Sequence, residues 1–323
     1  MLPAMSQPIR AGVWSATPTP FTANYDLDVA SVPRLVDQHA ALGVAGLMLA
    51  GTCGEGAWMR ERDRETLTRT VVAANAGRMK IALQVTDNSA LRTLDNIDQA
   101  AAWGAEIAVV AAPYFVFNAT PERLVAYYRE IARQSSLPIG LYDRGANSPF
   151  SVPQASLLDI TAEPKIVMLK DSSTNPVRRD LYLKARENRP DLVLLNGDEF
   201  NCVAYLEAGY NGLLLGGGIF NGAIASQIID AVRAGDRPRA ERLQQRMADL
   251  MYRVYGGPKI ECWLTGLKEL LVQMKVFSTT TNLLGYPLTD ACRQQISDAV
   301  SGADGLAFNA DLFGTAAKKS RVA

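Results

Sequence analysis

The sequence is poor in histidine and cysteine. It contains one histidine, His39, and four cysteines, none of which forms a Cys-x-x-Cys pair. A hydrolytic zinc site normally needs two or three imidazoles, so metal-dependent hydrolysis and metal-dependent aldol chemistry are disfavoured. A Ser-His-Asp triad would depend on His39, which lies in the middle of the helical stretch VPRLVDQHAALG, and we expect a structural role for it. The cysteines are expected to be reduced, mostly buried thiols.

The sequence also has no excess charge and no long apolar run. Its 33 basic and 33 acidic residues give zero net charge, whereas nucleic-acid-binding proteins normally carry a basic excess. No stretch approaches the roughly 18 consecutive apolar residues of a membrane span. The first ten residues, MLPAMSQPIR, lack the basic region and apolar core of a signal peptide. We therefore expect a soluble, cytoplasmic protein that binds neither nucleic acid nor membranes.

What the sequence does contain is a regular alternation of short apolar runs and amphipathic stretches. Eight near-continuous apolar runs are typical of parallel strands covered on both faces, and they lie at residues 11–21, 45–51, 80–86, 106–113, 138–143, 166–173, 191–198 and 212–218. Helices are expected between many of them, at residues 31–42, 61–76, 89–103, 121–135 and 175–188. The alternation predicts an α/β fold, a (β/α)8 TIM barrel. A doubly wound open sheet is the alternative, but SATPTPF after the first run is not a glycine-rich phosphate turn.

After residue 222 the pattern becomes wholly helical. The helical stretches lie at residues 222–233, 236–255, 258–276 and 290–301. They predict a C-terminal helical extension of the barrel. We expect four segments along the chain, namely an N-terminal leader (1–10), the barrel (11–233), a C-terminal helical segment (234–301) and a flexible tail (302–323).

Lys170 stands at the end of the sixth expected strand, in the stretch IVMLKDSS. In a (β/α)8 barrel the reactive residues lie where strands end and βα loops begin. Burial among apolar neighbours disfavours the ammonium form of a lysine, and a neutral amine condenses with a ketone or aldehyde to form a Schiff base. The structural alternative is a lysine that pairs with Asp171 or another carboxylate at the rim. The spacing alone leaves both interpretations open.

Two other strand ends carry residues that suit the same chemistry. Tyr142 ends the fifth expected strand, where a phenol can pass protons to and from a substrate, although a buried ring with a satisfied hydroxyl is the alternative. The stretch GTCGEG (51–56) follows the second strand, and its backbone N–H groups are suited to holding a carboxylate. Many turns share this pattern, so the stretch by itself does not identify a carboxylate-binding site. Cys53 has no histidine partner in the sequence and is not expected to be a nucleophile.

These strand ends, taken together, resemble a known family. GTCGE after the second strand, LYD at the end of the fifth and LKDSS at the end of the sixth are similar to the dihydrodipicolinate synthase / N-acetylneuraminate lyase family. The resemblance runs from about residue 10 to about residue 300 and includes NGD after the seventh strand and the C-terminal helices. Each motif by itself is moderately specific, whereas their joint order on eight expected strands is highly specific.

The resemblance implies a class I lyase that forms a Schiff base with pyruvate or a related 2-oxo acid. Lys170 corresponds to the family's imine-forming lysine and Tyr142 to its proton-carrying tyrosine. Thr52 and Cys53 correspond to the pair that holds the substrate carboxylate, with Thr52 also relaying protons from Tyr142. Leu214 corresponds to a position whose backbone carbonyl faces the bound pyruvate. The resemblance also implies no metal or organic cofactor, and a homo-oligomer, either a dimer or a tetramer.

The sequence departs from the family's synthases at several positions. In Pro113-Tyr114-Phe115, Phe115 replaces the second of two adjacent tyrosines, which reaches into the neighbouring subunit's site in those synthases. Asn147 stands where they have an arginine for the second substrate's carboxylate, and both differences argue against the synthase reaction. Arg144 could supply a cation from another direction, but we expect a surface-exposed position for it. Cys53 replaces a threonine or serine, and its backbone N–H can still donate.

The leading hypothesis is therefore an aldolase-type lyase that acts on pyruvate or a related 2-oxo acid through a lysine imine. The first alternative is a dehydratase of a 2-keto-3-deoxy sugar acid that uses the same imine. A loose similarity of YDRGAN (142–147) to the family's sugar-acid dehydratases favours this alternative weakly. Dihydrodipicolinate synthase activity is a further alternative. A non-catalytic barrel that binds a small molecule is the alternative from another class.

Overall fold

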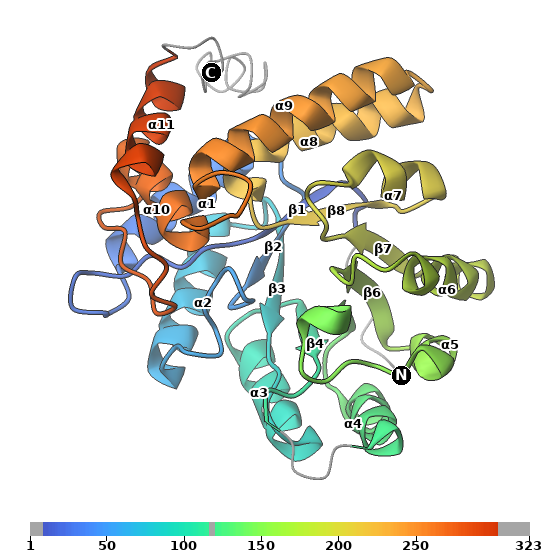
Figure 1. Cartoon of the computed structure of the whole chain (residues 1–323). Helices are drawn as coiled ribbons and strands as arrows, with labels where there is room; N and C mark the ends of the chain where they lie inside the picture. Colours follow the sequence, from blue (N-terminus) through green and yellow to red (C-terminus); the bar gives the residue numbers. More distant parts are fainter. Residues whose placement is uncertain (1–8, 116–119, 303–323) are drawn as a thin grey trace.

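The fold is a closed barrel of eight parallel strands, seen along its axis in the computed structural model of Figure 1, which describes residues 9–115 and 120–302. The strands follow one another around the barrel in chain order, with β8 pairing with β1. They are β1 (Val13–Ala16), β2 (Gly46–Leu49), β3 (Lys80–Gln84), β4 (Ile107–Ala111), β5 (Ile139–Asp143), β6 (Ile166–Asp171), β7 (Val193–Asn196) and β8 (Gly212–Leu215). This confirms the predicted (β/α)8 TIM barrel.

Helices surround the barrel. They are α1 (Val32–Ala41), α2 (Glu61–Asn75), α3 (Ala90–Ala102), α4 (Pro121–Gln134), α5 (Leu157–Thr161), α6 (Pro176–Asn188), α7 (Cys202–Ala208), α8 (Gly218–Arg233), α9 (Arg237–Tyr255), α10 (Trp263–Gln273) and α11 (Asp290–Ser301), with short 3₁₀ turns at Val29–Ser31, Gly145–Asn147 and Gln154–Ser156. The sequence did not predict α5 and α7, because five and seven residues are too few for a helical periodicity to stand out.

The apolar runs of the sequence are longer than the strands that they form. The first run was expected to extend from residue 11 to residue 21, but β1 ends at Ala16. Pro18 and Pro20 follow, and a proline has no backbone N–H to donate to a neighbouring strand. The strands are nevertheless buried on both faces, with all four residues of β1, β2 and β8 shielded from solvent. This double burial is the physical origin of the near-continuous apolar runs.

The C-terminal helices form the predicted extension. Figure 1 shows α9 lying along α8, with α10 and α11 beside the end of α9. Helix α9 is in contact with α8, α10 and α11. The boundary that we expected between residues 233 and 234 coincides with the end of α8. Most of the predicted leader (1–10) and nearly all of the predicted tail (302–323) lie outside the described residues. Within the described ranges, no helix is both long and apolar enough to cross a membrane.

His39 has the structural role that the sequence predicted. It is fully buried in α1, with Nδ1 at 2.7 Å from the Leu35 carbonyl oxygen and Nε2 at 2.8 Å from the Ser15 hydroxyl of β1. A carbonyl oxygen can only accept, so Nδ1 is assigned the proton and Nε2 accepts from Ser15. Burial lowers the pKa of His39 to about 4, which keeps the ring neutral at pH 7. The ring therefore ties α1 to the barrel wall.

Candidate active site

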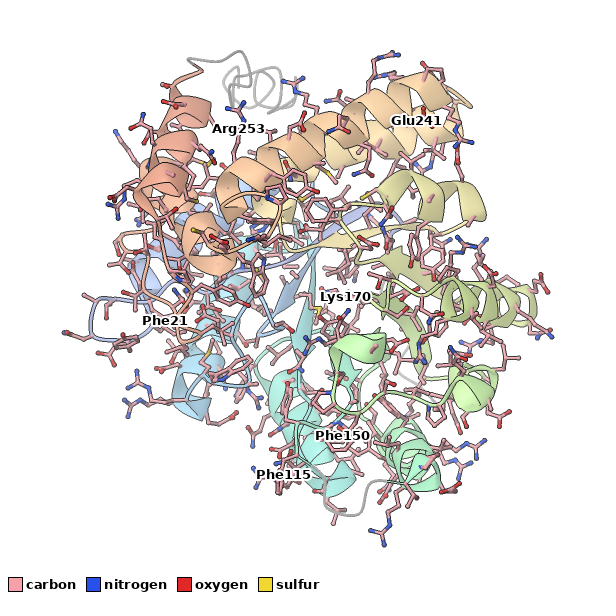
Figure 2. All side chains as sticks on the ribbon, viewed as in Figure 1. Phe21, Phe115, Phe150, Lys170, Glu241 and Arg253 are labelled. Atoms are coloured by element: carbon pink, nitrogen blue, oxygen red, sulfur yellow. The ribbon has the colours of Figure 1, made fainter. Side chains whose placement is uncertain are left out.

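Lys170 and Tyr142 lie side by side at the carboxyl ends of adjacent strands. They are register partners in β6 and β5, and the Lys170 ammonium nitrogen lies 4.3 Å from the centre of the Tyr142 ring. Both side chains are buried, with 5% and 6% of their surfaces exposed. Figure 2 shows Lys170 near the middle of the barrel opening. The strand pairing therefore places an amine and a phenol together where barrel enzymes carry their reactive groups.

Asp171 is not the partner of Lys170. Successive residues of a strand point to opposite faces, so Asp171 is directed away from Lys170. Its Oδ1 accepts a hydrogen bond from the Ser173 hydroxyl (2.6 Å) and its Oδ2 accepts one from the Tyr210 hydroxyl (2.7 Å). The structural alternative of a Lys170–Asp171 pair is therefore wrong. Among the described residues, no carboxylate forms a salt bridge with Lys170.

The neighbouring carboxylate, Asp143, anchors the end of β5 in the same way. It forms a buried ion pair with Arg178 of α6 (2.5 Å) and accepts hydrogen bonds from the Tyr182 hydroxyl (2.6 Å) and the Gly145 backbone N–H (2.9 Å). Arg144 lies between the hydrogen-bonded residues Asp143 and Gly145. It is half-buried and lines the cleft described below, whereas the sequence had suggested an exposed surface position.

The Tyr142 hydroxyl is suited to proton transfer. It lies 3.4 Å from the Thr52 hydroxyl, which follows β2. Burial by itself would raise the pKa of Tyr142, but the charge of Lys170, the hydrogen bond to Thr52 and the charge of Arg144 together hold this pKa below its ordinary value. The phenol therefore gives up its proton more readily than a free tyrosine.

The loop after β2, residues 51–56, brings Thr52 and Cys53 to the same site. A Cβ on Gly56 would lie 1.9 Å from the Ala50 carbonyl oxygen, so only glycine allows the loop to fold back this tightly. Within the part of the chain that the structure describes, the backbone N–H groups of Thr52 and Cys53 have no acceptor in hydrogen-bond geometry. Burial raises the pKa of the Cys53 thiol to about 12, which agrees with the expectation that it is not a nucleophile.

A cleft of about 910 Å³ opens over these residues. Lys170, Tyr142, Thr52 and Cys53 all line it, so the structure brings together four of the five site residues expected from the sequence. Leu214 lies within β8 and is not among the lining residues, which include Gly216 from the same part of the chain. Asn147, Arg144 and the exposed Lys259 add polar groups to the rim. In the described ranges, no group of three or more His, Cys, Asp or Glu side chains is arranged to hold a metal ion.

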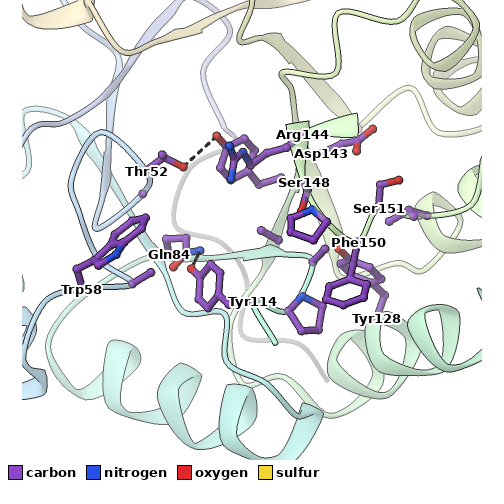
Figure 3. Close-up of a pocket in the computed structure, with 18 residues that line it drawn as sticks. Thr52, Trp58, Gln84, Tyr114, Tyr128, Asp143, Arg144, Ser148, Phe150 and Ser151 are labelled. Carbon is purple, nitrogen blue, oxygen red and sulfur yellow. Dashed lines mark hydrogen bonds between the residues drawn. The ribbon is translucent and has the colours of Figure 1, made fainter. Parts of the chain in front are cut away.

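A smaller pocket of about 180 Å³ adjoins the cleft, and Figure 3 shows the residues that line it. It shares Thr52, Trp58, Tyr142 and Arg144 with the cleft. The Gln84 amide donates a hydrogen bond to the Tyr114 hydroxyl, and both residues line this pocket. The adjacent Phe115 is 66% exposed and does not line either space.

Glu199 is a cleft residue that the sequence interpretation did not assign. It follows β7 in NGDEF, and it is the one carboxyl-bearing side chain among the described residues that line the cleft. Its Oε1 accepts the Gly217 backbone N–H (2.6 Å) and its Oε2 accepts the Tyr255 hydroxyl (3.3 Å). Burial raises the pKa of Glu199, although these hydrogen bonds and the charge of Lys170 oppose the shift. Its place after a strand end was the signal that could have identified it.

Comparisons with known proteins agree with this fold. The dihydrodipicolinate synthetase family model matches residues 10–303. A 4-hydroxy-tetrahydrodipicolinate synthase from Roseobacter denitrificans is 27% identical over 282 residues, which cover 87% of this chain and 94% of that protein. An N-acetylneuraminate lyase from Rhizobium meliloti is 29% identical over 234 residues, which cover 72% of this chain and 76% of that protein.

Solved structures share the fold. The dihydrodipicolinate synthase of Thermotoga maritima superposes with a TM-score of 0.82 at 22% identity, over 92% of this chain and 99% of that one. A prophage protein of the same family from E. coli K12, solved in complex with pyruvate, gives a TM-score of 0.80 at 22% identity, over 90% and 97% of the two chains. Since the family model spans nearly the whole described barrel and its helical extension, the chain belongs to the dihydrodipicolinate synthetase family and is an enzyme of the class I, Schiff-base lyase type.

Proposed function

We propose that this enzyme binds a 2-oxo acid as an imine on Lys170 and makes or breaks the bond beta to the imine carbon, as an aldolase does. The observation that carries the proposal is a buried lysine without a carboxylate partner among the described residues, placed 4.3 Å from the ring of Tyr142. Burying an amine without a carboxylate partner costs stability, so a chemical role such as imine formation accounts for its presence. The pyruvate bound to the E. coli relative supports a small 2-oxo acid as the substrate.

The proposed roles follow the geometry of the cleft. The Lys170 amine adds to the C2 carbonyl carbon, and loss of water from the carbinolamine leaves a protonated imine. The Tyr142 phenol supplies the proton that this departing water needs, and the Thr52 hydroxyl at 3.4 Å relays protons to it. The Thr52 and Cys53 backbone N–H groups hold the C1 carboxylate. By the resemblance to the family, the backbone carbonyl of Leu214 is proposed to face the bound substrate.

The imine at C2 allows two reactions at C3 and C4 of the substrate. Proton loss from the C4 hydroxyl cleaves the C3–C4 bond, which is the retro-aldol reaction. Proton gain by the same hydroxyl allows water to leave, which is the reaction of a 2-keto-3-deoxy sugar acid dehydratase. Glu199 is the observation that favours the dehydratase as a second candidate, because it adds an acidic group to the cleft. Phe115 and Asn147 argue against the synthase reaction. Phe115 has no hydroxyl proton where the synthases have a tyrosine, and Asn147 has no positive charge where they have an arginine. A homodimer or homotetramer stays a prediction.

Borohydride trapping tests the imine. The enzyme would be reduced in the presence of pyruvate, or of one of a panel of longer 2-oxo acids, and the adduct mapped by mass spectrometry. We expect a stable adduct on Lys170 with at least one member of the panel. If no 2-oxo acid gives an adduct, the imine mechanism and the proposed function are wrong.

A Tyr142→Phe variant is expected to slow imine formation by about 10²–10³-fold, because the proton donor for carbinolamine dehydration is lost. The phenol donates only while it is protonated, and its pKa is below the ordinary value for tyrosine. The wild-type rate should therefore fall on the alkaline side of its pH profile, at a lower pH than for a free tyrosine, and the variant should lack this fall. Stopped-flow or quenched-flow trapping with pyruvate measures both.

The matched control is Tyr25→Phe, since Tyr25 is 56% exposed and lies away from the cleft. It should keep the wild-type rate and pH profile. A Tyr142→Phe variant that behaves like this control would remove Tyr142 from the proposed mechanism.

A further inference from the structure

Arg144 is a cleft residue to which the proposed mechanism assigns no contact with the substrate. It follows β5 directly and is half-buried. It lines both the cleft and the smaller pocket, as do Thr52, Trp58 and Tyr142, so it stands where the two spaces meet. Figure 3 shows its side chain extending from the loop after β5 toward Thr52. The guanidinium group therefore lies beside the proposed reaction centre.

The charge of Arg144 acts on two phenols at this junction. Burial would raise the pKa of Tyr142, but the charges of Lys170 and Arg144 are among the effects that hold it below its ordinary value. Burial raises the pKa of Tyr114, and the charge of Arg144 is among the effects that oppose this rise. A ligand that lies over Tyr142 is therefore within reach of the guanidinium group.

Arg144 has no counter-charge. In the part of the chain that the structure describes, its guanidinium group forms no ion pair and no hydrogen bond. The carboxylate of the preceding residue, Asp143, is paired with Arg178 instead. The N–H donors of a guanidinium group form a fork that matches a carboxylate or a phosphate. A half-buried guanidinium group without an anion is thus half of an anion-binding site.

Two neutral donors from the same loop accompany the guanidinium group. Asn147 lines the cleft and Ser148 lines the smaller pocket, and both follow Arg144 closely in the chain. Within residues 9–115 and 120–302, neither of these two side chains has a hydrogen-bond partner. The segment 144–151 therefore offers a guanidinium group, an amide and a hydroxyl to one region and contains no carboxylate that would compete for them.

We propose that the substrate carries a second oxyanion at the end remote from its 2-oxo acid group, and that Arg144 binds this oxyanion. The inference rests on the imine proposed above for Lys170. The C1 carboxylate is already assigned to the loop after β2, and a cleft of about 910 Å³ is far larger than a three-carbon acid requires. A longer 2-oxo acid whose chain passes Tyr142 brings its far end to Arg144. The second oxyanion is a terminal carboxylate or a phosphate ester, which share the geometry that the guanidinium fork recognises.

Lys259 is the alternative group for binding such an anion. It lies on the rim of the cleft, between α9 and α10, and is exposed. An exposed ammonium group attracts anions over a distance, but salt screens its charge and its flexible stem must be ordered before it can make a contact. The half-buried Arg144 is screened less. We therefore assign the contact to Arg144 and only long-range attraction to Lys259.

Borohydride trapping with matched acids tests the assignment. The probes are six-carbon 3-deoxy-2-oxo acids that differ only at the far end, which is a carboxylate, a phosphate ester or a hydroxymethyl group. The measured quantity is the acid concentration that gives half-maximal adduct on Lys170. With the wild-type enzyme, we expect this concentration to be about 10²-fold lower for at least one of the two far-end anions than for the hydroxymethyl acid. The anionic acid with the lower value identifies the terminal group.

Variants assign this preference to a residue. In Arg144→Gln the preference should fall below about threefold, because an amide has neither the charge nor the fork, and Arg144→Lys should keep only part of it. The effect of Arg144 on Tyr142 is common to all three acids, so it cancels from the preference. Trapping of pyruvate, which has no second oxyanion, should persist in both variants. The control is Arg242→Gln at an exposed position of α9, which should match the wild type.

Each result has one meaning. Absence of any adduct with the wild-type enzyme would reject the imine itself, and with it the proposed function. Adducts that form with equal half-maximal concentrations for all three acids would overturn only the second oxyanion. A preference that survives in Arg144→Gln would overturn the assignment to Arg144, and its loss in Lys259→Gln would then transfer the contact to Lys259.

Discussion

Replacing Lys170 with alanine is expected to abolish the borohydride-trapped adduct and to lower turnover on the order of 10⁴-fold or more. The variant removes the only atom that is proposed to bond covalently with the substrate, so neither retro-aldol cleavage nor water elimination has an electron sink. The cleft, with Thr52 and Tyr142, stays in place, so weak binding of pyruvate should persist. Mass spectrometry of the intact protein after reduction measures the adduct, and a coupled assay measures turnover.

Two further variants isolate the covalent role. Lys170→Arg keeps a positive charge beside Tyr142 but supplies no amine that condenses with a carbonyl, so it should be as inactive as Lys170→Ala. Lys184→Ala, at an exposed lysine of α6, is the matched control and should keep both adduct and turnover. If Lys170→Ala retained full turnover, or if the adduct mapped to another lysine, the central assignment would be wrong.

Removing the charge of Lys170 without removing its bulk should not cost stability. Lys170 is 5% exposed and has no salt-bridge partner among the described residues, so the folded protein gains little from its charge. A Lys170→Met variant fills similar space without a charge, and we expect its unfolding midpoint in urea to equal or exceed that of the wild type. A stabilised but inactive variant is the signature of a residue kept for chemistry.

The sequence was sufficient to predict the barrel and the central pair. Each strand is apolar on both faces, and a residue that closes such a strand must lie at the barrel opening, so Lys170 and Tyr142 could be placed before any coordinates. Their contact depends on register, in which Tyr142 faces Lys170 and Asp143 faces Asp171. The sequence alone could not give that register. It also left open the Lys170–Asp171 pair, which the structure rules out because β6 continues through Asp171 and successive side chains point to opposite faces.

Residues whose roles depend on contacts between distant segments could not be predicted. Glu199 follows an ordinary strand end, and its importance arises from Gly217 and Tyr255, which are 18 and 56 residues away. Arg144 was expected at the surface, but it lines a cleft together with residues of distant segments such as Lys259. Lys268 gave no sequence signal at all. It lies in an apolar helix, and its partner Glu55 is 213 residues distant.

The Glu55–Lys268 pair links the site to the C-terminal helices. Both side chains are fully buried, and the Lys268 ammonium lies 2.5 Å from Glu55 Oε1. It also donates to the Thr281 carbonyl oxygen (2.7 Å), while Glu55 Oε2 accepts the Leu283 N–H. The ammonium lies 4.7 Å from the centre of the Phe21 ring, which Figure 2 labels. Since Glu55 belongs to the loop that carries Thr52 and Cys53, the pair fixes that loop to the extension.

Breaking this pair from one side is expected to be severely destabilising. Lys268→Met leaves the Glu55 carboxylate buried without its counter-charge, and Glu55→Gln leaves the Lys268 ammonium in the same position. Each single variant should lower the free energy of unfolding by about 3–5 kcal/mol. The double variant Glu55→Gln/Lys268→Met removes both charges, so it should be much less destabilised than the sum of the singles. Urea unfolding of all four proteins measures this coupling.

The pair should also affect substrate binding, because a loop freed from its anchor no longer presents the Thr52 and Cys53 N–H groups in one geometry. Under conditions where the single variants stay folded, we expect the KM for the 2-oxo acid to rise roughly tenfold or more, since small displacements of binding groups are costly. The control is Glu65→Gln, which breaks the exposed Arg69–Glu65 pair of α2 and should cost less than about 0.5 kcal/mol without changing KM. If Lys268→Met were as mild as this control, the C-terminal extension would not hold the site in place, and the barrel alone would position the carboxylate-binding loop.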